Sequence, residues 1–404
     1  MLDNETFDVV VVGGGPAGAT AAHDLTRQGR SVLLLDRAGR IKPCGGAIPP
    51  RAISDFDIPA HLIVARATSA RMISPADCEV DMPIEKGFVG MVDREVFDEW
   101  LRARAAAAGA QRRSGTFERI ERDADGCAAV VFRQAARDTA QDAATPLQRL
   151  RARCVIGADG AISAVARQNI PGADKMPFVF AYHEVIKMPA GGGAHYDGGS
   201  RCEIYYNGKL SPDFYAWIFP HGDTMSVGTG SARKGFALRG AVADLRARSG
   251  LADTKTIRRE GAPIPMKPLK KWDNGRDIVL AGDACGVVAP ASGEGIYYAM
   301  LGGRLAADSA QDFLASGNPR ALRTARKRFM KSHGRVFWIL GIMQYFWYRS
   351  DKMREKFVSI CRDKDVQKLT WDSYMNKELT RQKPMAHVRI FFKDLGHLFG
   401  IVRP

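Results

Sequence analysis

The feature that most constrains the fold stands at the start of the chain, in the stretch FDVVVVGGGPAGATAAHDLTRQGRSVLLLDR. Phe7–Val12 is a largely β-branched run, which is typical of a strand buried on both faces of a parallel sheet. Three glycines follow with G-x-G-x-x-G spacing, and Ala17–Gln28 then has helical composition. Ser31–Leu35 predicts a second buried strand, which ends at Asp36. Strand, glycine turn, helix, strand and acid in this order predict a dinucleotide-binding unit of the Rossmann type.

Each part of this motif has a mechanical reason. Gly13 allows a tight turn, Gly15 lets a pyrophosphate approach the backbone, and Gly18 lets the helix pack on the sheet. The N-terminal N–H groups of the helix face the negative charge. Asp36 can accept hydrogen bonds from the ribose of an adenosine. The motif by itself leaves FAD and NAD both open as the dinucleotide.

The length and charge of the chain limit the number of domains and the classes of partner. Its 404 residues suffice for two globular domains or for one α/β unit with an insertion. Its net charge of +15 favours nucleic acid, anionic lipid or acidic ligands as partners. The N-terminus lacks the basic region of a secretory signal, and no apolar run is long enough to predict a membrane-spanning helix.

Seven cysteines are scattered along the chain without a C-x-x-C pair. This pattern predicts reduced thiols in a cytoplasm-facing compartment, and the lack of closely spaced Cys and His residues argues against a metal site. Cys44 stands out because it precedes two glycines in the stretch KPCGGAIP, soon after the predicted second strand. A metal ligand and half of a disulfide are therefore poor interpretations of Cys44, while a functional thiol and a small loop residue both stay open.

Two later stretches separate FAD from NAD. Cys154–Arg167 predicts a strand that runs into Gly-Ala-Asp-Gly, and Asp277–Met300 predicts a strand, a Gly-Asp pair, two further glycines and a helix. Together with the first motif they resemble the para-hydroxybenzoate-hydroxylase-type flavoproteins. The resemblance implies FAD, with Asp283 at its ribityl chain and the N-terminus of the later helix at the flavin pyrimidine, where it stabilises negative charge.

The resemblance implies a set of cofactor-binding residues. They are Gly13, Gly15, Ala17, Gly18, Asp36, Arg37, Cys44, Gly45, Gly46, Ala47, Arg94, Asp159, Asp283, Gly293, Gly295 and Ile296. Asp283 has a competing interpretation as a turn or cap residue, and Arg94 as a solvated charge on a helix predicted from Asp93 to Gly109. Asp159 lies in a loop where Ala166 stands in place of the family's usual arginine. The chain has no second G-x-G-x-x-G motif that could bind NADPH, so we expect NADPH to dock transiently on the flavin domain.

The middle of the chain predicts an antiparallel sheet, and the resemblance implies that this sheet is the substrate-binding insertion. From Met176 to about Arg233 apolar and polar residues alternate, which indicates antiparallel strands. In the motif Y-x-W-x-F-P this alternation puts Tyr215, Trp217 and Phe219 on one face. They are either ordinary core or a hydrophobic wall beside the flavin for a long apolar substrate. Before this part, residues 133–148 predict an exposed hairpin excursion that precedes a strand at Arg153.

The last third of the chain is basic and aromatic. The apolar run Val336–Tyr348 has Lys and Arg residues on both sides and is too short to span a bilayer. This pattern suits an interfacial segment on anionic lipid, and a pair of packed core helices is the alternative. His387–Val402 adds a second apolar stretch. No recognisable nucleic-acid motif accompanies the basic residues, so we expect no nucleic-acid partner.

These patterns predict an α/β fold in three parts. Residues 1–175 with 275–318 form a Rossmann-type FAD-binding domain, and residues 176–274 form an antiparallel β-sheet substrate domain. Residues 319–404 form a helical, basic and aromatic C-terminal region with an expected membrane association.

KPCGGAIP, GDACGVVAPASGEGIYYAM, Y-x-W-x-F-P and the long tail after Ile360 resemble the geranylgeranyl reductases of (bacterio)chlorophyll synthesis. The resemblance implies FAD- and NADPH-dependent stepwise reduction of three isolated double bonds of a geranylgeranyl chain to give phytyl. The expected substrate is geranylgeranyl-bacteriochlorophyllide, with geranylgeranyl diphosphate and archaeal-type geranylgeranyl lipids as alternatives, and ferredoxin is an alternative to NADPH. The resemblance also implies peripheral association with the cytoplasmic side of the photosynthetic membrane, near bacteriochlorophyll synthase or other pigment-synthesis proteins.

Reduction of an isolated alkene needs a proton as well as a hydride, and no carbonyl is present to stabilise a carbanion. The site therefore needs a dry apolar pocket and an acid close to the flavin. Cys44 is the candidate catalytic acid, because an ordinary thiol is mostly protonated at neutral pH. Two other classes share these motifs: an FAD-dependent aromatic monooxygenase and a non-catalytic flavoprotein scaffold. A halogenase is disfavoured because the chain lacks a W-x-W-x-I-P signature.

Overall fold

The structure is a computed structural model that describes residues 5–37, 42–134, 147–189 and 196–377. Its α-helices are α1 Pro16–Arg27, α2 Pro50–Asp55, α3 Arg94–Ala107, α4 Ala164–Asn169, α5 Leu238–Arg248, α6 Ile296–Ser316, α7 Arg323–Trp347, α8 Asp351–Ile360 and α9 Lys364–Asn376. Its strands are β1 Thr6–Val12, β2 Val32–Asp36, β3 Ala47–Ile48, β4 Ile63–Ala67, β5 Ser69–Ile73, β6 Glu79–Pro83, β7 Val89–Val92, β8 Gln111–Arg122, β9 Ala128–Gln134, β10 Leu147–Gly157, β11 Phe178–Lys187, β12 Arg201–Tyr205, β13 Ala216–His221, β14 Thr224–Ser231, β15 Thr256–Pro265 and β16 Ile278–Leu280.

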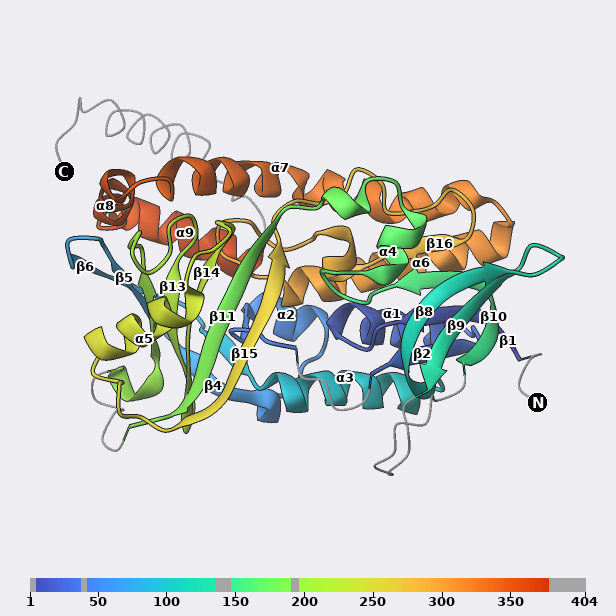
Figure 1. Cartoon of the computed structure of the whole chain (residues 1–404), viewed down its shortest axis with the longest axis horizontal. Helices are drawn as coiled ribbons and strands as arrows, with labels where there is room; N and C mark the ends of the chain where they lie inside the picture. The colour runs from blue at the N-terminus through green and yellow to red at the C-terminus, as the bar shows by residue number, and fades with distance from the viewer. Residues whose placement is uncertain (1–4, 38–41, 135–146, 190–195, 378–404) are drawn as a thin grey trace.

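The first sheet is built on the predicted nucleotide-binding motif. β1 pairs in parallel with β2 on one side and with β10 on the other, β8 extends the sheet beyond β2, and β16 extends it beyond β10. Helix α1 packs against both α3 and α6 (Figure 1). The predicted order of strand, glycine turn, helix and strand is therefore confirmed. Gly13 has φ +107, and a Cβ there would lie 2.3 Å from the carbonyl oxygen of Ala158, so no other residue fits this turn.

Helix α3 begins where the sequence predicts. The Asp93 carboxylate accepts a hydrogen bond from the backbone N–H of Glu95 at 2.9 Å, which is an N-cap. Phe97 and Leu101 are buried, while Val96 is 56% exposed. The buried face of α3 therefore excludes Val96.

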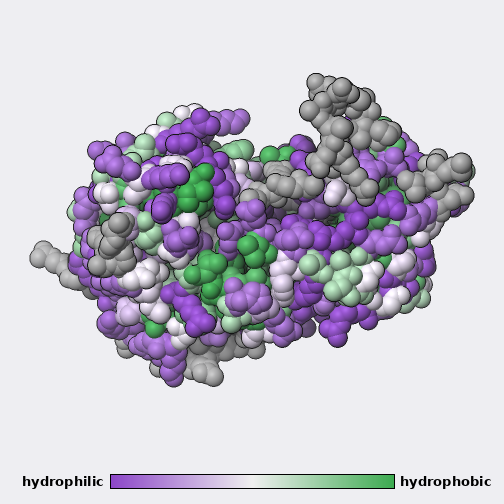
Figure 2. Space-filling view, turned by 90° about the horizontal axis from the view of Figure 1, so that it is seen from below, coloured by the Kyte–Doolittle hydropathy of each residue, from purple (hydrophilic) through white to green (hydrophobic). Residues whose placement is uncertain are grey.

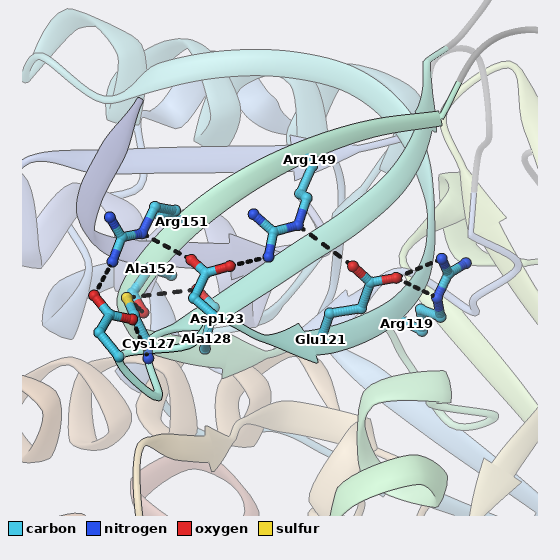
Figure 3. Close-up of polar contacts among 9 residues, drawn as sticks. Arg119, Glu121, Asp123, Cys127, Ala128, Arg149, Arg151 and Ala152 are labelled. Carbon is cyan, nitrogen blue, oxygen red and sulfur yellow. Dashed lines mark hydrogen bonds and ion pairs between the residues drawn. The ribbon is translucent and has the colours of Figure 1, made fainter. Parts of the chain in front are cut away.

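The strands β8, β9 and β10 form an antiparallel extension of the first sheet. β10 begins at Leu147, six positions before the predicted start at Arg153, because the backbone of this extension pairs with β9. Residues 135–146 of the predicted excursion lie outside the described residues. Figure 3 shows a ladder of ion pairs from Arg119 to Arg151, which joins side chains of β8, of Asp123 in the following turn and of β10 across β9.

The second sheet has seven strands in the order β15-β11-β14-β13-β12-β5-β6. It is antiparallel from β15 to β12, as predicted. β5 and β6, which come from much earlier in the chain, were not anticipated, and β5 runs parallel to β12. A third, three-stranded sheet has the order β3-β7-β4. The proposed boundaries between the three domains stay a prediction.

The C-terminal helices connect the two large sheets. α7 packs on α6 in the Rossmann half and runs along one long edge of the molecule to α8, which contacts β6 (Figure 1). α9 contacts α2, and the side-chain amide of Gln367 on α9 donates to the backbone carbonyl of Asp81 at 3.1 Å. Among the described residues, no helix is both long and apolar enough to cross a membrane.

The buried apolar residues form three clusters. One belongs to the Rossmann half, and one lies between the second sheet and α5. The third lies on the other face of that sheet and joins Tyr215 and Trp217 to Trp347, Tyr348 and residues of α8 and α9. The C-terminal helices therefore share a core with the Y-x-W-x-F-P motif.

The surface is mostly hydrophilic when seen from below, with hydrophobic residues gathered in a patch near the middle of that face (Figure 2). Among the described residues, the exposed large apolar side chains are Val64, Val96, Leu147, Ile162, Phe180, Ile257, Trp338, Ile342, Tyr345 and Phe346. Four of these ten lie on α7. The predicted aromatic run is therefore partly core and partly surface.

Candidate active site

The predicted nucleotide-binding motifs meet at one edge of the first sheet. The carboxyl ends of β1, β2, β10 and β16 lead into Gly13, Asp36, Ala158 and Ala281 respectively. Because these strands are parallel, the four loops lie at the same edge, where α/β folds bind their ligands. The structure thus brings together motifs that are more than 260 residues apart, since Gly13 and Ala281 are separated by 268 positions in the sequence.

The first turn of α1 has the chemistry that a diphosphate needs. No side chain caps this end of the helix, and no acidic residue lies in its first turn. A Cβ at Gly15 would have nothing within 4 Å, so the space beside the backbone is open. Ala17 and Gly18 are buried against neighbouring elements. The exposed N–H groups and the helix dipole fit the diphosphate of a dinucleotide such as FAD.

Asp36 lies at the end of β2, as predicted, and has a partner that the sequence did not reveal. Arg102 of α3 donates to the Asp36 carboxylate and to the backbone carbonyl of Gly14, both at 3.2 Å. Asp36 and Arg102 line a cavity of about 190 Å³, together with Leu34, Arg37, Glu99, Arg112, Arg113 and Ser114. This cavity adjoins the open end of α1 and suits the polar adenosine end of a dinucleotide.

The KPCGGAIP loop lies against the Gly-Asp loop and the second sheet. The Lys42 ammonium donates to the Asp283 carboxylate, so the Asp283 side chain is held by an ion pair and does not cap a helix. A Cβ at Gly45 would lie 3.1 Å from the ring of Phe219. Gly46 has φ +69, and its neighbour Ala47 enters β3. The loop therefore passes between the first sheet and the aromatic motif.

Cys44 lies beside one hydrogen-bond donor and one cation. The backbone N–H of Gly46 donates to the Cys44 sulfur at 3.4 Å, and the Arg94 guanidinium interacts with that sulfur electrostatically. Arg94 also makes a bidentate ion pair with Asp98, at 2.7 and 2.8 Å, and is buried. Burial opposes the charge of Arg94, but Asp98 and Cys44 more than offset it, so the pKa of Arg94 is raised. The interpretation of Arg94 as a solvated helix charge is wrong.

The aromatic motif forms a row on one face of the second sheet, as its spacing predicts. Ring centroids are 5.9 Å apart between Tyr215 and Trp217 and 6.1 Å apart between Trp217 and Phe219. The Tyr215 hydroxyl donates to the backbone carbonyl of Ser292 at 2.5 Å, and a Cβ at Gly293 would lie 3.3 Å from that hydroxyl. The row thus reaches from the KPCGGAIP loop to the Gly293 turn, which leads into Gly295 and the first α6 residue, Ile296.

His221 is a site residue that the sequence analysis missed. Its ring nitrogen Nε2 would lie 2.7 Å from a Cβ at Gly46, and Nδ1 bonds the carbonyl of Phe219 at 3.0 Å. Burial lowers the pKa of His221, although backbone hydrogen bonds with Phe219 and Gly45 oppose the shift. Its place directly after Y-x-W-x-F-P was the available signal, because strand β13 continues into His221.

A chain of hydrogen bonds behind Trp217 was also missed. The Trp217 indole donates to the Ser226 hydroxyl at 3.1 Å, and Ser226 lies 2.9 Å from Nδ1 of His183. The other nitrogen of His183 lies 3.1 Å from Glu260. A Cβ at Gly228 would lie 2.3 Å from the Trp217 ring, so the indole lies flat against bare backbone. These residues fix the orientation of the middle aromatic ring.

Asp159 has a structural role at the loop after β10. Its carboxylate accepts hydrogen bonds from the Ser163 hydroxyl at 2.5 Å and from the backbone N–H of Ala164 at 2.7 Å. It also accepts from the backbone N–H of Val165 at 3.1 Å. Burial raises the pKa of Asp159, and these donors oppose the shift. Asp159 therefore supports the N-terminus of α4, whose N-cap residue is Ser163, and both Asp159 oxygens already have partners.

Comparison with known proteins agrees with this architecture. A family model described as an NAD(P)-binding Rossmann-like domain matches residues 11–72. The chain is 58% identical over 398 residues to geranylgeranyl diphosphate reductase of Rhodobacter capsulatus, which covers 98% of this chain and 99% of that protein.

Two solved structures have a similar fold. One is a geranylgeranyl bacteriochlorophyll reductase-like protein of Thermoplasma acidophilum, with a TM-score of 0.80 and 22% identity over 95% of this chain and 99% of that one. The other is the flavin-dependent brominase Bmp2, with a TM-score of 0.71 and 16% identity over 96% of this chain and 99% of that one. They confirm the predicted fold with its Rossmann-type domain. Because its identity to the Rhodobacter protein extends over nearly the whole length of both, the chain belongs to the geranylgeranyl reductase family.

Proposed function

We propose that this protein uses FAD and NADPH to reduce isolated double bonds of a geranylgeranyl chain carried by a bacteriochlorophyllide, one bond at a time, to give phytyl. The observation that carries the proposal is the aromatic row between the Cys44 loop and the Gly293 turn. A buried row of rings suits a long apolar chain, and the open first turn of α1 suits the diphosphate of FAD.

The residues at this site have different roles in the reaction. Bound FAD supplies the hydride. Gly13, Gly15 and the N–H groups of α1 would hold its diphosphate, and Asp36 its ribose. The aromatic row binds the isoprenoid chain and excludes water, which favours proton transfer from a nearby acid.

Cys44 is placed to give the alkene its proton. A backbone N–H group only donates hydrogen bonds, so the Cys44 sulfur accepts from Gly46 and its own hydrogen stays available. Once that proton has moved to carbon, the Gly46 N–H and the Arg94 charge are in place to stabilise the thiolate until solvent returns a proton. Each double bond thereby gains one hydride and one proton.

Anaerobic turnover tests this function. The holoenzyme is incubated without oxygen with NADPH and geranylgeranyl-bacteriochlorophyllide, and in parallel with geranylgeranyl diphosphate. Mass spectrometry should find successive gains of two hydrogens per reduced bond on the pigment, with three bonds reduced at completion. Preferential reduction of the diphosphate would identify geranylgeranyl diphosphate as the substrate. Product that forms only with oxygen would support an aromatic monooxygenase instead.

Cys44→Ala tests the acid, and Cys127→Ala is its matched control. Cys127 is a half-buried thiol at the end of the ion-pair ladder (Figure 3), where its sulfur contacts the backbone carbonyl of Ala152 at 3.4 Å. We expect Cys44→Ala to bind FAD normally and lose most of its turnover, while Cys127→Ala keeps both. Full turnover of Cys44→Ala with a normal FAD content would rule out the proton-donor role.

The exposed face of α7 supports a peripheral membrane association, which we propose to be on the cytoplasmic side. Trp338 and Tyr345 are 68% and 69% exposed, and Ile342 between them shares their face of the helix. The exposed cations Arg335 and Arg349 stand at the two ends of this stripe. Aromatic rings between cations suit the headgroup region of an anionic bilayer.

Vesicle binding tests this association. The full chain should sediment with phosphatidylglycerol vesicles and much less with phosphatidylcholine vesicles, and salt should weaken the binding. The double variant Trp338→Ser/Tyr345→Ser should lose most of it. Phe180→Ser is the control, because Phe180 is an exposed aromatic residue on β11, outside the stripe. Equal loss in both variants would contradict the assignment of α7 as the lipid-facing element.

A further inference from the structure

A buried ion pair joins the end of α9 to the turn before α6. The Lys377 ammonium lies 2.8 Å from a carboxylate oxygen of Glu294, and each side chain is 3% exposed. Lysine and glutamate are buried to this extent almost only when they are paired. The pair spans 83 positions of the sequence, because it joins residues 294 and 377. It therefore ties the C-terminal helical region to the candidate active site.

On one side of the pair, Glu294 shapes the turn that faces the cofactor site. Its other carboxylate oxygen accepts from the backbone N–H of Tyr297 at 2.9 Å, in the first turn of α6. Its backbone carbonyl accepts from the N–H of Ala289 at 2.9 Å. Gly293 and Gly295 stand on either side of it. The Glu294 side chain therefore fixes how the N-terminus of α6 is presented.

On the other side, Lys377 is held in an unusual conformation. It has φ +56, in the left-handed region that lysine rarely adopts, at the residue where α9 ends. Its ammonium lies 4.0 Å from the ring centroid of Tyr374 and 5.4 Å from that of Tyr298. Burial lowers the pKa of Lys377, and Glu294 opposes the shift. The contacts of the ammonium stabilise a backbone geometry that would otherwise be unfavourable.

We propose that Lys377 is a positioning residue that holds the Gly293–Gly295 turn, through Glu294, in the shape that receives the flavin. The geometry of α9 and the affinity for FAD are then coupled. This inference rests on the proposed function, because it requires FAD at the N-terminus of α6. It gives the C-terminal helices a role in the oxidoreductase site that is separate from contact with lipid.

The test compares Lys377→Met with Lys368→Met in the full chain. Lys368 lies on the same helix, is exposed, and has its acidic partner Glu85 at 4.0 Å. FAD affinity is measured by titration of the apoprotein, and the flavin midpoint potential by equilibrium reduction of the holoenzyme. We expect Lys377→Met to weaken FAD binding roughly 5- to 150-fold, the usual range of coupling between sites. Its midpoint potential should become more negative, because the α6 N-terminus no longer stabilises the reduced flavin. Lys368→Met should match the wild type in both.

A second variant decides the matter if Lys377→Met does not fold. Glu294→Gln/Lys377→Met leaves no unpaired buried charge, and we expect it to fold and to retain the weakened FAD affinity. Wild-type affinity and potential in this double variant would overturn the inference. Wild-type protein that binds no FAD would overturn the proposed function and this inference with it, so the two failures are distinguishable.

Discussion

The hydroxyl of Tyr215 donates a 2.5 Å hydrogen bond to the backbone carbonyl of Ser292, and so joins the aromatic row to the turn before α6. The ring of Tyr215 is stacked on that of Phe214, with centroids 4.2 Å apart. The position of the aromatic row is therefore linked to the position of the Gly293 turn. A substrate bound along the row is held at a fixed distance from any group bound at the turn.

Tyr215→Phe should loosen this link without removing the ring. Loss of one buried hydrogen bond should lower the free energy of unfolding by about 1 kcal/mol. The product mixture should shift toward partly reduced chains, because the aromatic row no longer fixes the Gly293 turn. Denaturant unfolding and mass spectrometry of the products measure the two effects.

Tyr205→Phe is the matched control for this prediction. The Tyr205 hydroxyl donates to Glu203 at 2.7 Å, and its ring packs in the cluster that lies against α5. It should lose comparable stability and leave the products unchanged. The same product shift in both variants would mean that general loosening of the sheet, and not the Ser292 contact, controls the outcome.

We expect Arg94 to be necessary both for the stability of the fold and for proton transfer from Cys44. Arg94→Met leaves Asp98 buried without a partner and should cost about 3–5 kcal/mol of stability. Arg94→Met/Asp98→Leu removes both charges and should recover most of that loss. If the contact with Cys44 matters for proton transfer, the double variant still turns over slowly. A double variant that is both stable and fully active would show that Arg94 serves the fold alone.

The parts of the site that the sequence predicted are those with local signatures. β1, the glycine turn, α1, β2 and Asp36 follow within 36 residues, and each is dictated by backbone conformation or by burial on a parallel sheet. The aromatic row was predicted because side chains two positions apart share a face of a strand.

The parts that the sequence did not predict depend on how distant segments dock. The pairing of Arg94 with Cys44 requires α3 to pack beside the KPCGGAIP loop, and no periodicity encodes that contact. Lys377 likewise meets Glu294 only because α9 folds back onto the turn before α6. β5 and β6 were missed because they join the second sheet only through the pairing of β5 with β12. That strand begins at Arg201, more than 100 residues after β5 ends at Ile73. Side-chain identity alone cannot indicate such partners.

His221 should make stability depend on pH. Its pKa is lower in the folded state than in the unfolded chain, so the unfolded chain binds the extra proton. The neutral form is fully compatible with folding above the unfolded pKa of about 6.5, and stability falls as the pH drops below that value toward the folded pKa. Within this window one proton changes stability by up to about 1.4 kcal/mol per pH unit. Asp93 and His183 are the other titratable groups that act on it.

Denaturant unfolding at pH 7.5 and 5.5 measures this effect. His221→Gln should flatten the dependence, because glutamine does not titrate. His61→Gln is the control, because His61 is exposed and should leave the dependence unchanged. The carboxylates are the same in both variants, so the comparison isolates the contribution of His221. An unaltered pH dependence in His221→Gln would contradict the assignment.

The hydrogen bonds behind Trp217 should control how the isoprenoid chain lies in the site. An indole N–H can only donate, so the Ser226 hydroxyl accepts from Trp217 and connects it to His183. Ser226→Ala leaves the Trp217 N–H buried without a partner, at a cost of about 1–3 kcal/mol. The freed ring should rotate and change which double bonds are reduced.

Ser231→Ala is a close control, because Ser231 is also buried on β14 and donates to Asp213 at 2.7 Å. Emission of Trp217, obtained by subtracting the Trp217→Phe spectrum, should shift in Ser226→Ala and stay constant in Ser231→Ala. A shift in emission with unchanged products would separate the orientation of the ring from the choice of double bond.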